Sequence, residues 1–205
     1  MGIEVLVVQH GEKVRSAGDP GLTEVGRRQA ATVATWLAEN RPDIDAIVAS
    51  PLRRAQETAA PIAAAFGLEL TTEPRVRERM NWDDAASIDL DGFLTEWQRA
   101  TDDRAYQPAV GDSSVNAAAR FIDALVDLEH DHAGVVVVVA HGGVTVDTLR
   151  TIAGDRSVSD VNADLISNGV PSCAITQLRV TNGAITVIDY PSTDHLDQTT
   201  RHHPA

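Results

Sequence analysis

The sequence predicts an α/β fold with a mainly parallel sheet, helices on both faces and an antiparallel edge hairpin. Short runs rich in β-branched residues alternate along the chain with longer segments whose apolar residues recur at helical spacing. Near the end of the chain, Asn182-Gly183 separates two short apolar runs, and this dipeptide is typical of a tight hairpin turn. A length of 205 residues without an internal repeat or a linker predicts a single domain over 1–205.

Strands and helices alternate regularly in the first third of the chain. Thr23 and Ser50, followed by Pro51, suit helix N-caps, and Gly67 suits the end of a helix. The predicted elements are a strand at 3–8, a helix from Thr23 to about 40, a strand at 46–49, a helix from Ser50 to Gly67, and a weaker strand at 69–72.

The pattern blurs between about 74 and 112, where Trp82, Trp97 and many carboxylates predict an inserted lid with partial helix. Regular alternation then resumes, and the polar end of the chain after about 195 is expected to be frayed. The remaining predicted elements are a helix at 114–129, a strand at 134–140, a helix at 143–153 and two hairpin strands at 174–180 and 184–190.

The net charge and the length of the longest apolar run argue against two kinds of partner, nucleic acids and membranes. Seventeen basic and thirty acidic residues give a net charge of -13, which would repel a nucleic acid. The longest apolar run, Val135 to Ala140, is far shorter than the roughly 20 residues of a membrane helix, and no basic leader opens the sequence. We therefore expect a cytoplasmic protein without nucleic-acid or membrane partners, either monomeric or homodimeric, whose lone Cys173 serves packing.

Four polar residues follow predicted strands. His10 comes directly after the first strand, Arg54 four residues after Ser50, Glu78 shortly after the third strand, and His141 directly after the fourth. Ligands of open parallel sheets bind outside the carboxyl ends of the strands, so these side chains should meet at one edge. Each alone could be structural or solvated. Together, two imidazoles, a guanidinium and a carboxylic acid suit a phosphate ester, because neutral imidazole can attack phosphorus and a carboxylic acid can protonate the departing alkoxide.

These residues resemble the histidine phosphatase superfamily, the phosphoglycerate mutase-like proteins. Five motifs in order, over nearly the whole chain, carry the resemblance. They are Val7-Val8-Gln9-His10-Gly11-Glu12; Gly21-Leu22-Thr23 with Gly26 and Gln29; Ser50-Pro51-Leu52-Arg53-Arg54-Ala55-Gln56-Glu57-Thr58-Ala59; Val76-Arg77-Glu78; and Val139-Ala140-His141-Gly142-Gly143, followed near the end by Asp194-His195-Leu196.

The resemblance implies a phosphoglycerate mutase-like fold and a phosphohistidine mechanism. It implies that His10 is the nucleophile, that Arg54 and His141 bind the phosphoryl oxygens, and that Glu78 is the general acid. Gly11 and Gly142 would contribute backbone contacts. The partner would be a small phosphorylated substrate or inorganic phosphate, with no metal and no organic cofactor.

Gln9 departs from the family pattern, which has arginine before the nucleophile. Glutamine loses the charge and the bidentate fork, a loss of about 1.5–3 kcal/mol if nothing replaces it. Lys13 or Arg15, in the loop that would border the pocket, could restore the charge, or both could be solvated loop residues.

Basic residues are too few in the stretch from 79 to 140 for a mutase, which must hold a second anionic group. We therefore expect a metal-independent phosphatase, attenuated if nothing replaces the lost arginine, whose leaving group is neutral, cationic or weakly charged. Trp82 and Trp97 could offer it an apolar surface or could pack in the core. The alternatives are a weakly active or inactive member that binds a phosphorylated ligand because of Gln9, a phosphoglycerate mutase-type phosphotransferase, and a metal-dependent hydrolase using His10, Glu12 and His141.

Overall fold

A six-stranded mixed sheet forms the centre of the molecule. The computed structural model describes residues 2–82 and 88–196. The strands are β1 (Ile3–Gln9), β2 (Ile44–Ala49), β3 (Leu70–Thr72), β4 (Val135–Ala140), β5 (Ile175–Thr181) and β6 (Ala184–Ser192). Their spatial order is β3-β2-β4-β1-β5-β6. The first four are mutually parallel, while β5 runs antiparallel to β1 and β6 antiparallel to β5. The predicted fold class is confirmed.

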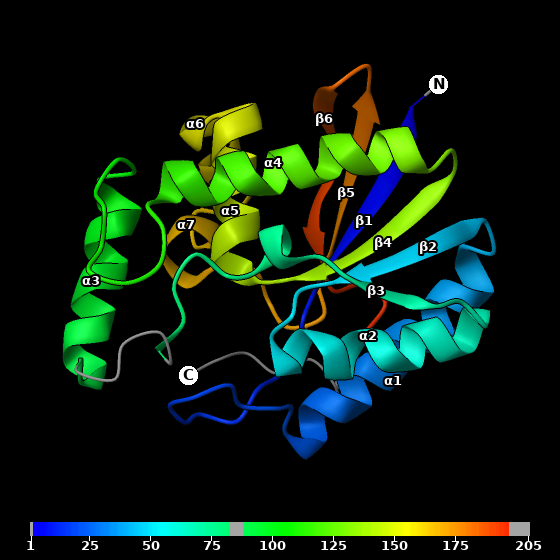
Figure 1. Ribbon diagram of the computed structural model, residues 1–205, viewed down its shortest axis with the longest axis horizontal. Coiled ribbons are helices and arrows are strands. Elements are labelled where there is room, and N and C mark those ends of the chain that lie inside the picture. Colours follow the sequence, from blue (N-terminus) through cyan, green and yellow to red (C-terminus); the bar gives the residue numbers. More distant parts are fainter. Residues whose placement is uncertain (1, 83–87, 197–205) are drawn as a thin grey trace.

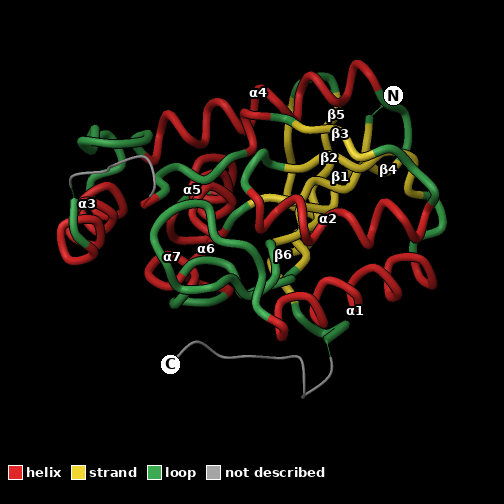
Figure 2. The backbone as a smooth tube through the Cα atoms, turned by 60° about the horizontal axis from the view of Figure 1, so that its bottom comes forward, coloured by secondary structure: helices red, strands yellow, loops and turns green. Residues whose placement is uncertain are grey.

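Helices cover both faces of this sheet (Figures 1 and 2). α1 and α2 lie on one face and α4 and α5 on the other, while α3 stands at the side, away from the strands. The helical segments are α1 (Glu24–Asn40), α2 (Arg53–Phe66), the 3-10 turn η1 (Pro74–Val76), α3 (Leu90–Asp102), α4 (Ser114–Asp131), α5 (Gly142–Ala153), α6 (Asp155–Val161) and α7 (Leu165–Asn168). Among the helices of residues 2–82 and 88–196, none is long and apolar enough to cross a bilayer.

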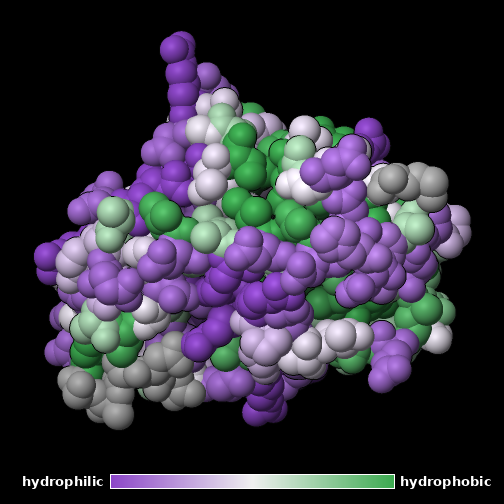
Figure 3. All heavy atoms as spheres, turned by 45° about the horizontal axis from the view of Figure 1, so that its top comes forward, coloured by the Kyte–Doolittle hydropathy of each residue, from purple (hydrophilic) through white to green (hydrophobic). Residues whose placement is uncertain are grey.

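The side chains of β4 contribute alternately to two hydrophobic cores, one on each face of the sheet. All six of its residues are buried, and successive side chains point to opposite faces of the sheet. Val136 and Val138 pack with Phe121 of α4 in one core. Val137 and Val139 pack in the other core, between the sheet and α1 and α2. Burying each such side chain contributes roughly 1.5–3 kcal/mol, so the carboxyl ends of β1 and β4 are held firmly. Polar residues cover much of the outer surface on the α4 side (Figure 3).

Caps and turns agree with the sequence, with one exception. Thr23 caps α1 by accepting a hydrogen bond from the Gly26 amide, and Gly67 ends α2 in the left-handed region at φ 64°. Asn182 also has positive φ in the hairpin turn. The predicted Ser50 cap is wrong, because α2 begins at Arg53 with Leu52 as its N-cap. The Ser50 hydroxyl instead lies 2.7 Å from the His141 ring, so its position serves the candidate site.

Two further segments differ from the expectations, while the 74–112 segment has the partial helix that the sequence predicts. The 74–112 segment contains η1 and α3, and part of it, 83–87, lies outside the described residues. α6 and α7 were not predicted, because they are short and only Val158 and Leu165 in them are buried. The chain stays packed further than expected, since Leu196 is 2% exposed; the expected frayed tail from 197 on lies outside the described residues.

Candidate active site

Four side chains meet where the parallel strands end. His10 follows β1, Arg54 lies in the first turn of α2, Glu78 follows η1, and His141 lies between β4 and α5. All four are buried, with exposures of 8% or less. The structure therefore brings together the residues that the strand-end argument selected.

His10 is held in one tautomer. Its Nδ1 lies 2.7 Å from the Gly11 carbonyl oxygen, which can only accept, so Nδ1 carries the proton and donates it. Its Nε2 accepts a hydrogen bond of 3.2 Å from Nε of Arg54. Burial, followed by the positive charge of Arg54, lowers the pKa of His10 from 6.5 to about 3. The ring is therefore neutral at physiological pH, with a lone pair on Nε2.

His141 packs edge-on against His10, with the ring centroids 5.2 Å apart. Its Nε2 shares a hydrogen bond of 2.7 Å with the Ser50 hydroxyl. Burial, then the charge of Arg54, holds the pKa of His141 well below its usual value. Within the described ranges its buried Nδ1 has no hydrogen-bond partner. A polar atom in this state is suited to an incoming ligand.

Arg54 is the buried positive charge of the site. Besides His10, its guanidinium donates to Asn81 at 3.2 Å and lies 3.8 Å from a carboxylate oxygen of Asp19. Asp19 is far more exposed than Arg54. A charge fixed in this way next to Nε2 suits a phosphoryl oxygen.

Glu78 lies at the N-terminus of α5. Its carboxylate accepts hydrogen bonds from the amides of Arg79, Gly143 and Val144, at 2.8–3.0 Å. Donors at a helix N-terminus favour a negative group in this place. The three amides take up three of the four lone pairs of the carboxylate, which leaves one lone pair on Oε2 for a proton.

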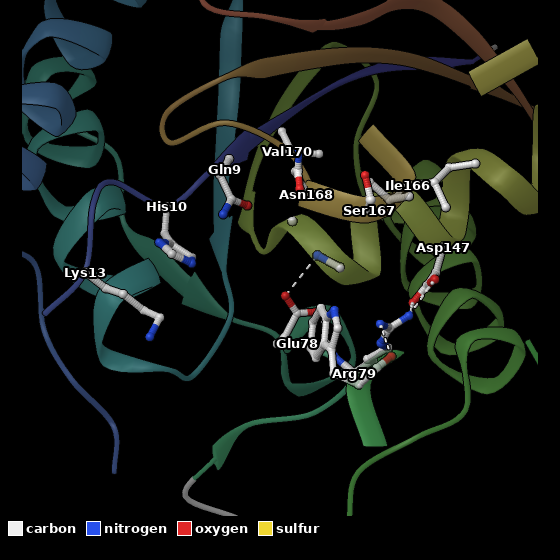
Figure 4. A pocket seen from close by; sticks show the side chains of 15 residues that line it. Gln9, His10, Lys13, Glu78, Arg79, Asp147, Ile166, Ser167, Asn168 and Val170 are labelled. Carbon is white, nitrogen blue, oxygen red and sulfur yellow. Dashed lines mark hydrogen bonds and ion pairs between the residues drawn. The ribbon is translucent and has the colours of Figure 1, made fainter. Parts of the chain in front are cut away.

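A cavity of about 220 Å³ opens beside these residues (Figure 4). Gln9, His10, Lys13, Glu78 and Gly142 line it, as the sequence predicted for the site. The predicted residues Arg54 and His141 lie behind this lining and do not form part of it. Gly11 does not line it either. Its amide donates to the Thr58 hydroxyl at 3.0 Å, and a Cβ at Gly11 would lie 2.6 Å from the Gly26 carbonyl oxygen. Gly11 is therefore needed for close packing of the loop from His10 to Glu12 on α1.

Lys13 and Arg15 differ in position. Lys13 lines the cavity, and burial together with the Arg54 charge lowers the pKa of its ammonium group. Arg15 is exposed and lines a neighbouring cavity of about 820 Å³, to which Lys13 also contributes. Gln9 is 7% exposed, and its Oε1 is without a partner in the part of the chain that the structure describes.

Sequence reasoning missed several residues of the cavity wall. Arg79, Asp147 and Ile166 line the end away from His10, and Val146 also lines the cavity. Trp97, for which the sequence left two roles open, also lines the cavity, whereas Trp82 donates its ring N–H to the Ile88 carbonyl outside it. The one sequence signal for any of these residues is that Arg79 directly follows the predicted site residue Glu78. Asp147 and Ile166 gave none, because only tertiary packing brings them here.

The comparison with protein families settles the family. The family model of the histidine phosphatase superfamily (branch 1) matches residues 5–193. The chain belongs to this superfamily. An uncharacterised protein from Mycobacterium tuberculosis is 38% identical over 159 residues, covering 72% of this chain and 76% of the relative.

Two further similar proteins carry an activity in their names. The glucosyl-3-phosphoglycerate phosphatase of M. tuberculosis is 34% identical over 149 residues, which is 65% of each chain. A solved mycobacterial glucosyl-3-phosphoglycerate phosphatase in complex with inorganic phosphate is similar with a TM-score of 0.70 and 26% identity, covering 95% of this chain and 99% of that one.

The described residues do not form a metal site. Within 2–82 and 88–196, the structure has no group of three or more His, Cys, Asp or Glu side chains placed to hold a metal ion. Glu12, one of the three ligands considered for a metal-dependent hydrolase, instead accepts a hydrogen bond of 2.7 Å from the Thr23 hydroxyl.

Proposed function

We propose that this chain is a phosphomonoester hydrolase that works through a phosphohistidine at His10. The observation that carries the proposal is the neutral His10 ring, whose Nδ1 proton is held by Gly11 and whose Nε2 faces Arg54. Membership of the histidine phosphatase superfamily and the phosphatase names of two relatives support it.

The first step is attack on phosphorus. Nε2 of His10 forms an N–P bond while the P–O bond to the leaving group breaks, and protonated Glu78 gives its proton to the departing alkoxide. In the second step Glu78 takes a proton from water, whose oxygen attacks phosphorus as the N–P bond breaks. Inorganic phosphate leaves and His10 is neutral again. Arg54 and His141 bind the phosphoryl oxygens, and Gly142 contributes its backbone.

Lys13 supplies the positive charge that Gln9 lacks. It lines the same cavity as His10, and no ion pair of Lys13 occurs among the described side chains. Arg15 is exposed and does not line this cavity, so of the two basic residues the geometry favours Lys13.

The test is hydrolysis of p-nitrophenyl phosphate from pH 4 to 8 in the presence of a chelator. Turnover in the wild type, loss of turnover in His10→Ala, and a base-stable, acid-labile phosphoprotein trapped during turnover are expected. His130→Ala, on the exposed end of α4, is the matched control and should keep full activity.

Other results would support other functions. Wild type that is inactive but gains activity as Gln9→Arg would indicate a ligand-binding member whose site Gln9 disables. Activity that chelator removes and divalent metal restores would indicate a metal-dependent hydrolase. Interconversion of 2- and 3-phosphoglycerate without net phosphate release would indicate a mutase.

A further inference from the structure

The mechanism sets the direction in which the leaving group departs; the inference that follows rests on the proposed function. In phosphoryl transfer the attacking atom and the leaving oxygen are roughly in line, on opposite sides of phosphorus. The attacking atom is Nε2 of His10, and the leaving oxygen must be within reach of Glu78. Beyond Glu78, the cavity continues to Arg79, Asp147 and Ile166, at the end opposite His10 and Lys13 (Figure 4).

A buried ion pair forms part of this far end. Arg79 and Asp147 are 3% and 1% exposed, and Nη1 of Arg79 lies 3.1 and 3.2 Å from the two carboxylate oxygens. The other terminal nitrogen donates to the Trp97 carbonyl and the Thr101 hydroxyl, and the guanidinium stacks on the Trp97 ring at 4.0 Å. The charge of Arg79 is therefore already matched.

The remaining donor of Arg79 takes no part in these contacts. Its Nε is buried and has no hydrogen-bond partner among the described residues, although the residue lines the cavity. A carboxylate is recognised best by two parallel N–H groups, and here only one is left. A single donor without net charge suits a neutral acceptor, such as a hydroxyl or carbonyl oxygen.

Size and apolar contacts limit the rest of the leaving group. The cavity, at about 220 Å³, is smaller than the roughly 300–1,000 Å³ typical of sites for drug-sized ligands. The phosphoryl group takes up the His10 end. Val146, Ile166 and Trp97 supply apolar surface around what remains.

We propose that the far end of the cavity is a leaving-group subsite for a short, uncharged alcohol that carries a second oxygen, which accepts a hydrogen bond from Nε of Arg79. The substrate class is thus the monophosphate esters of small polyols or hydroxycarbonyl compounds. Esters of plain alkanols lack the acceptor, and esters of hydroxy acids bring a carboxylate close to Asp147 and Glu78.

Three esters of similar length test the subsite: glycerol 1-phosphate, propyl phosphate and 3-phosphoglycerate. The expected kcat/KM is highest for glycerol 1-phosphate, by about tenfold over each of the others, as one hydrogen bond with good geometry would give. In Arg79→Lys, which keeps the charge but lacks Nε, the ratio of glycerol 1-phosphate to propyl phosphate should fall to about one.

Ile166→Trp provides a second variant that leaves the Arg79–Asp147 pair intact. It should lower kcat/KM for glycerol 1-phosphate about tenfold by filling the far end. Hydrolysis of methyl phosphate, whose leaving group does not reach Ile166, should fall by a clearly smaller factor. Equal hydrolysis of the three esters, or equal loss of methyl and glycerol phosphate hydrolysis in Ile166→Trp, would overturn the subsite while leaving the phosphatase intact. Absence of hydrolysis of every ester, including p-nitrophenyl phosphate, would instead refute the proposed function.

Discussion

At the scale of single residues, His10 is prepared for attack by two fixed neighbours. The Gly11 carbonyl determines which nitrogen carries the proton, and burial beside Arg54 opposes a second proton. In the proposed mechanism, the same guanidinium that keeps the ring neutral shifts its hydrogen bond from Nε2 of His10 to the incoming phosphoryl group. One positive charge can thus serve both nucleophilicity and substrate binding.

The tautomer can be tested by histidine side-chain ¹⁵N NMR. Because burial and Arg54 lower the pKa of His10 to about 3, its ring should remain neutral, with the proton on Nδ1, down to pH 5. Comparison with His10→Ala assigns the signal. A titration midpoint near the ordinary value of 6.5 would show that the ring is not held as described.

Lys13 and Arg15 offer a matched pair for the missing charge. Lys13→Ala should weaken inhibition by inorganic phosphate about ten- to a hundredfold, since a charge-assisted hydrogen bond is worth roughly 1.5–3 kcal/mol. Arg15→Ala should change the inhibition constant by less than about twofold, as expected for an exposed charge. Equal effects of the two substitutions would mean that Lys13 acts only through the general field of the loop.

At the scale of elements, the loop from His10 to Glu12 packs closely against the backbone of α1. A Cβ at Gly26 would lie only 2.1 Å from the Glu12 carbonyl oxygen, and the Glu12 amide donates to the Gln29 side chain at 2.8 Å. The helix thus fixes the residues that directly follow His10. On the other side, the Cys173 amide contacts the carbonyl oxygens of Gln9 and His10 at 3.1 and 3.3 Å.

Two glycine substitutions separate this packing from simple backbone strain. Gly26→Ala should cost about 1–3 kcal/mol of stability and lower kcat, because the loop must move away from α1. Gly67→Ala should cost about 1 kcal/mol for its positive φ with kcat unchanged, since no neighbouring atom lies within 4 Å of its Cβ position. Urea unfolding and p-nitrophenyl phosphate turnover measure the two quantities. Unchanged kcat in Gly26→Ala would argue against the role of the loop contact.

The elements also show which parts of the site the sequence could predict. His10, Arg54, Glu78 and His141 follow strands, and the topology of a parallel sheet forces such residues to one edge. Arg79, Asp147 and Ile166 come from three separate segments and meet only through side-chain packing, which no local pattern encodes. Ser50 misled for a related reason. It has the chemistry of a cap, but contact with His141 at the end of the neighbouring strand β4 takes precedence over local preference.

At the scale of the whole molecule, the sheet divides the site between two cores. The core on the α1 and α2 side positions Arg54, while the core on the α4 and α5 side positions His141, Asp147 and the amides that hold Glu78. Two of the buried ionisable groups of the site, His10 and Asp147, have pKa values shifted in opposite directions. Their titrations affect the stability of the entire fold, and they do so with opposite signs.

The contributions of His10 and Asp147 to the free energy of unfolding change with pH in opposite directions. The pKa of His10 is lowered, so its contribution is fully present above pH 6.5 and is lost as the pH falls through the range down to about 3. Burial raises the pKa of Asp147 from 3.8 to about 6, against the effect of Arg79. The folded state therefore holds the Asp147 proton more tightly than the unfolded chain, and Asp147 adds stability as the pH falls below about 6.

Asp147→Asn removes the contribution of Asp147 to the pH dependence of stability, because asparagine does not titrate. It also keeps an oxygen for Arg79 and Ser114. The difference in unfolding free energy between wild type and variant should grow in favour of the wild type by about 1 kcal/mol between pH 7 and pH 5. Urea unfolding of both proteins at the two pH values measures it, and the other titrating groups cancel in the difference. A gap that stays constant would mean that Asp147 remains ionised throughout, so that Arg79 outweighs burial at the far end of the cavity.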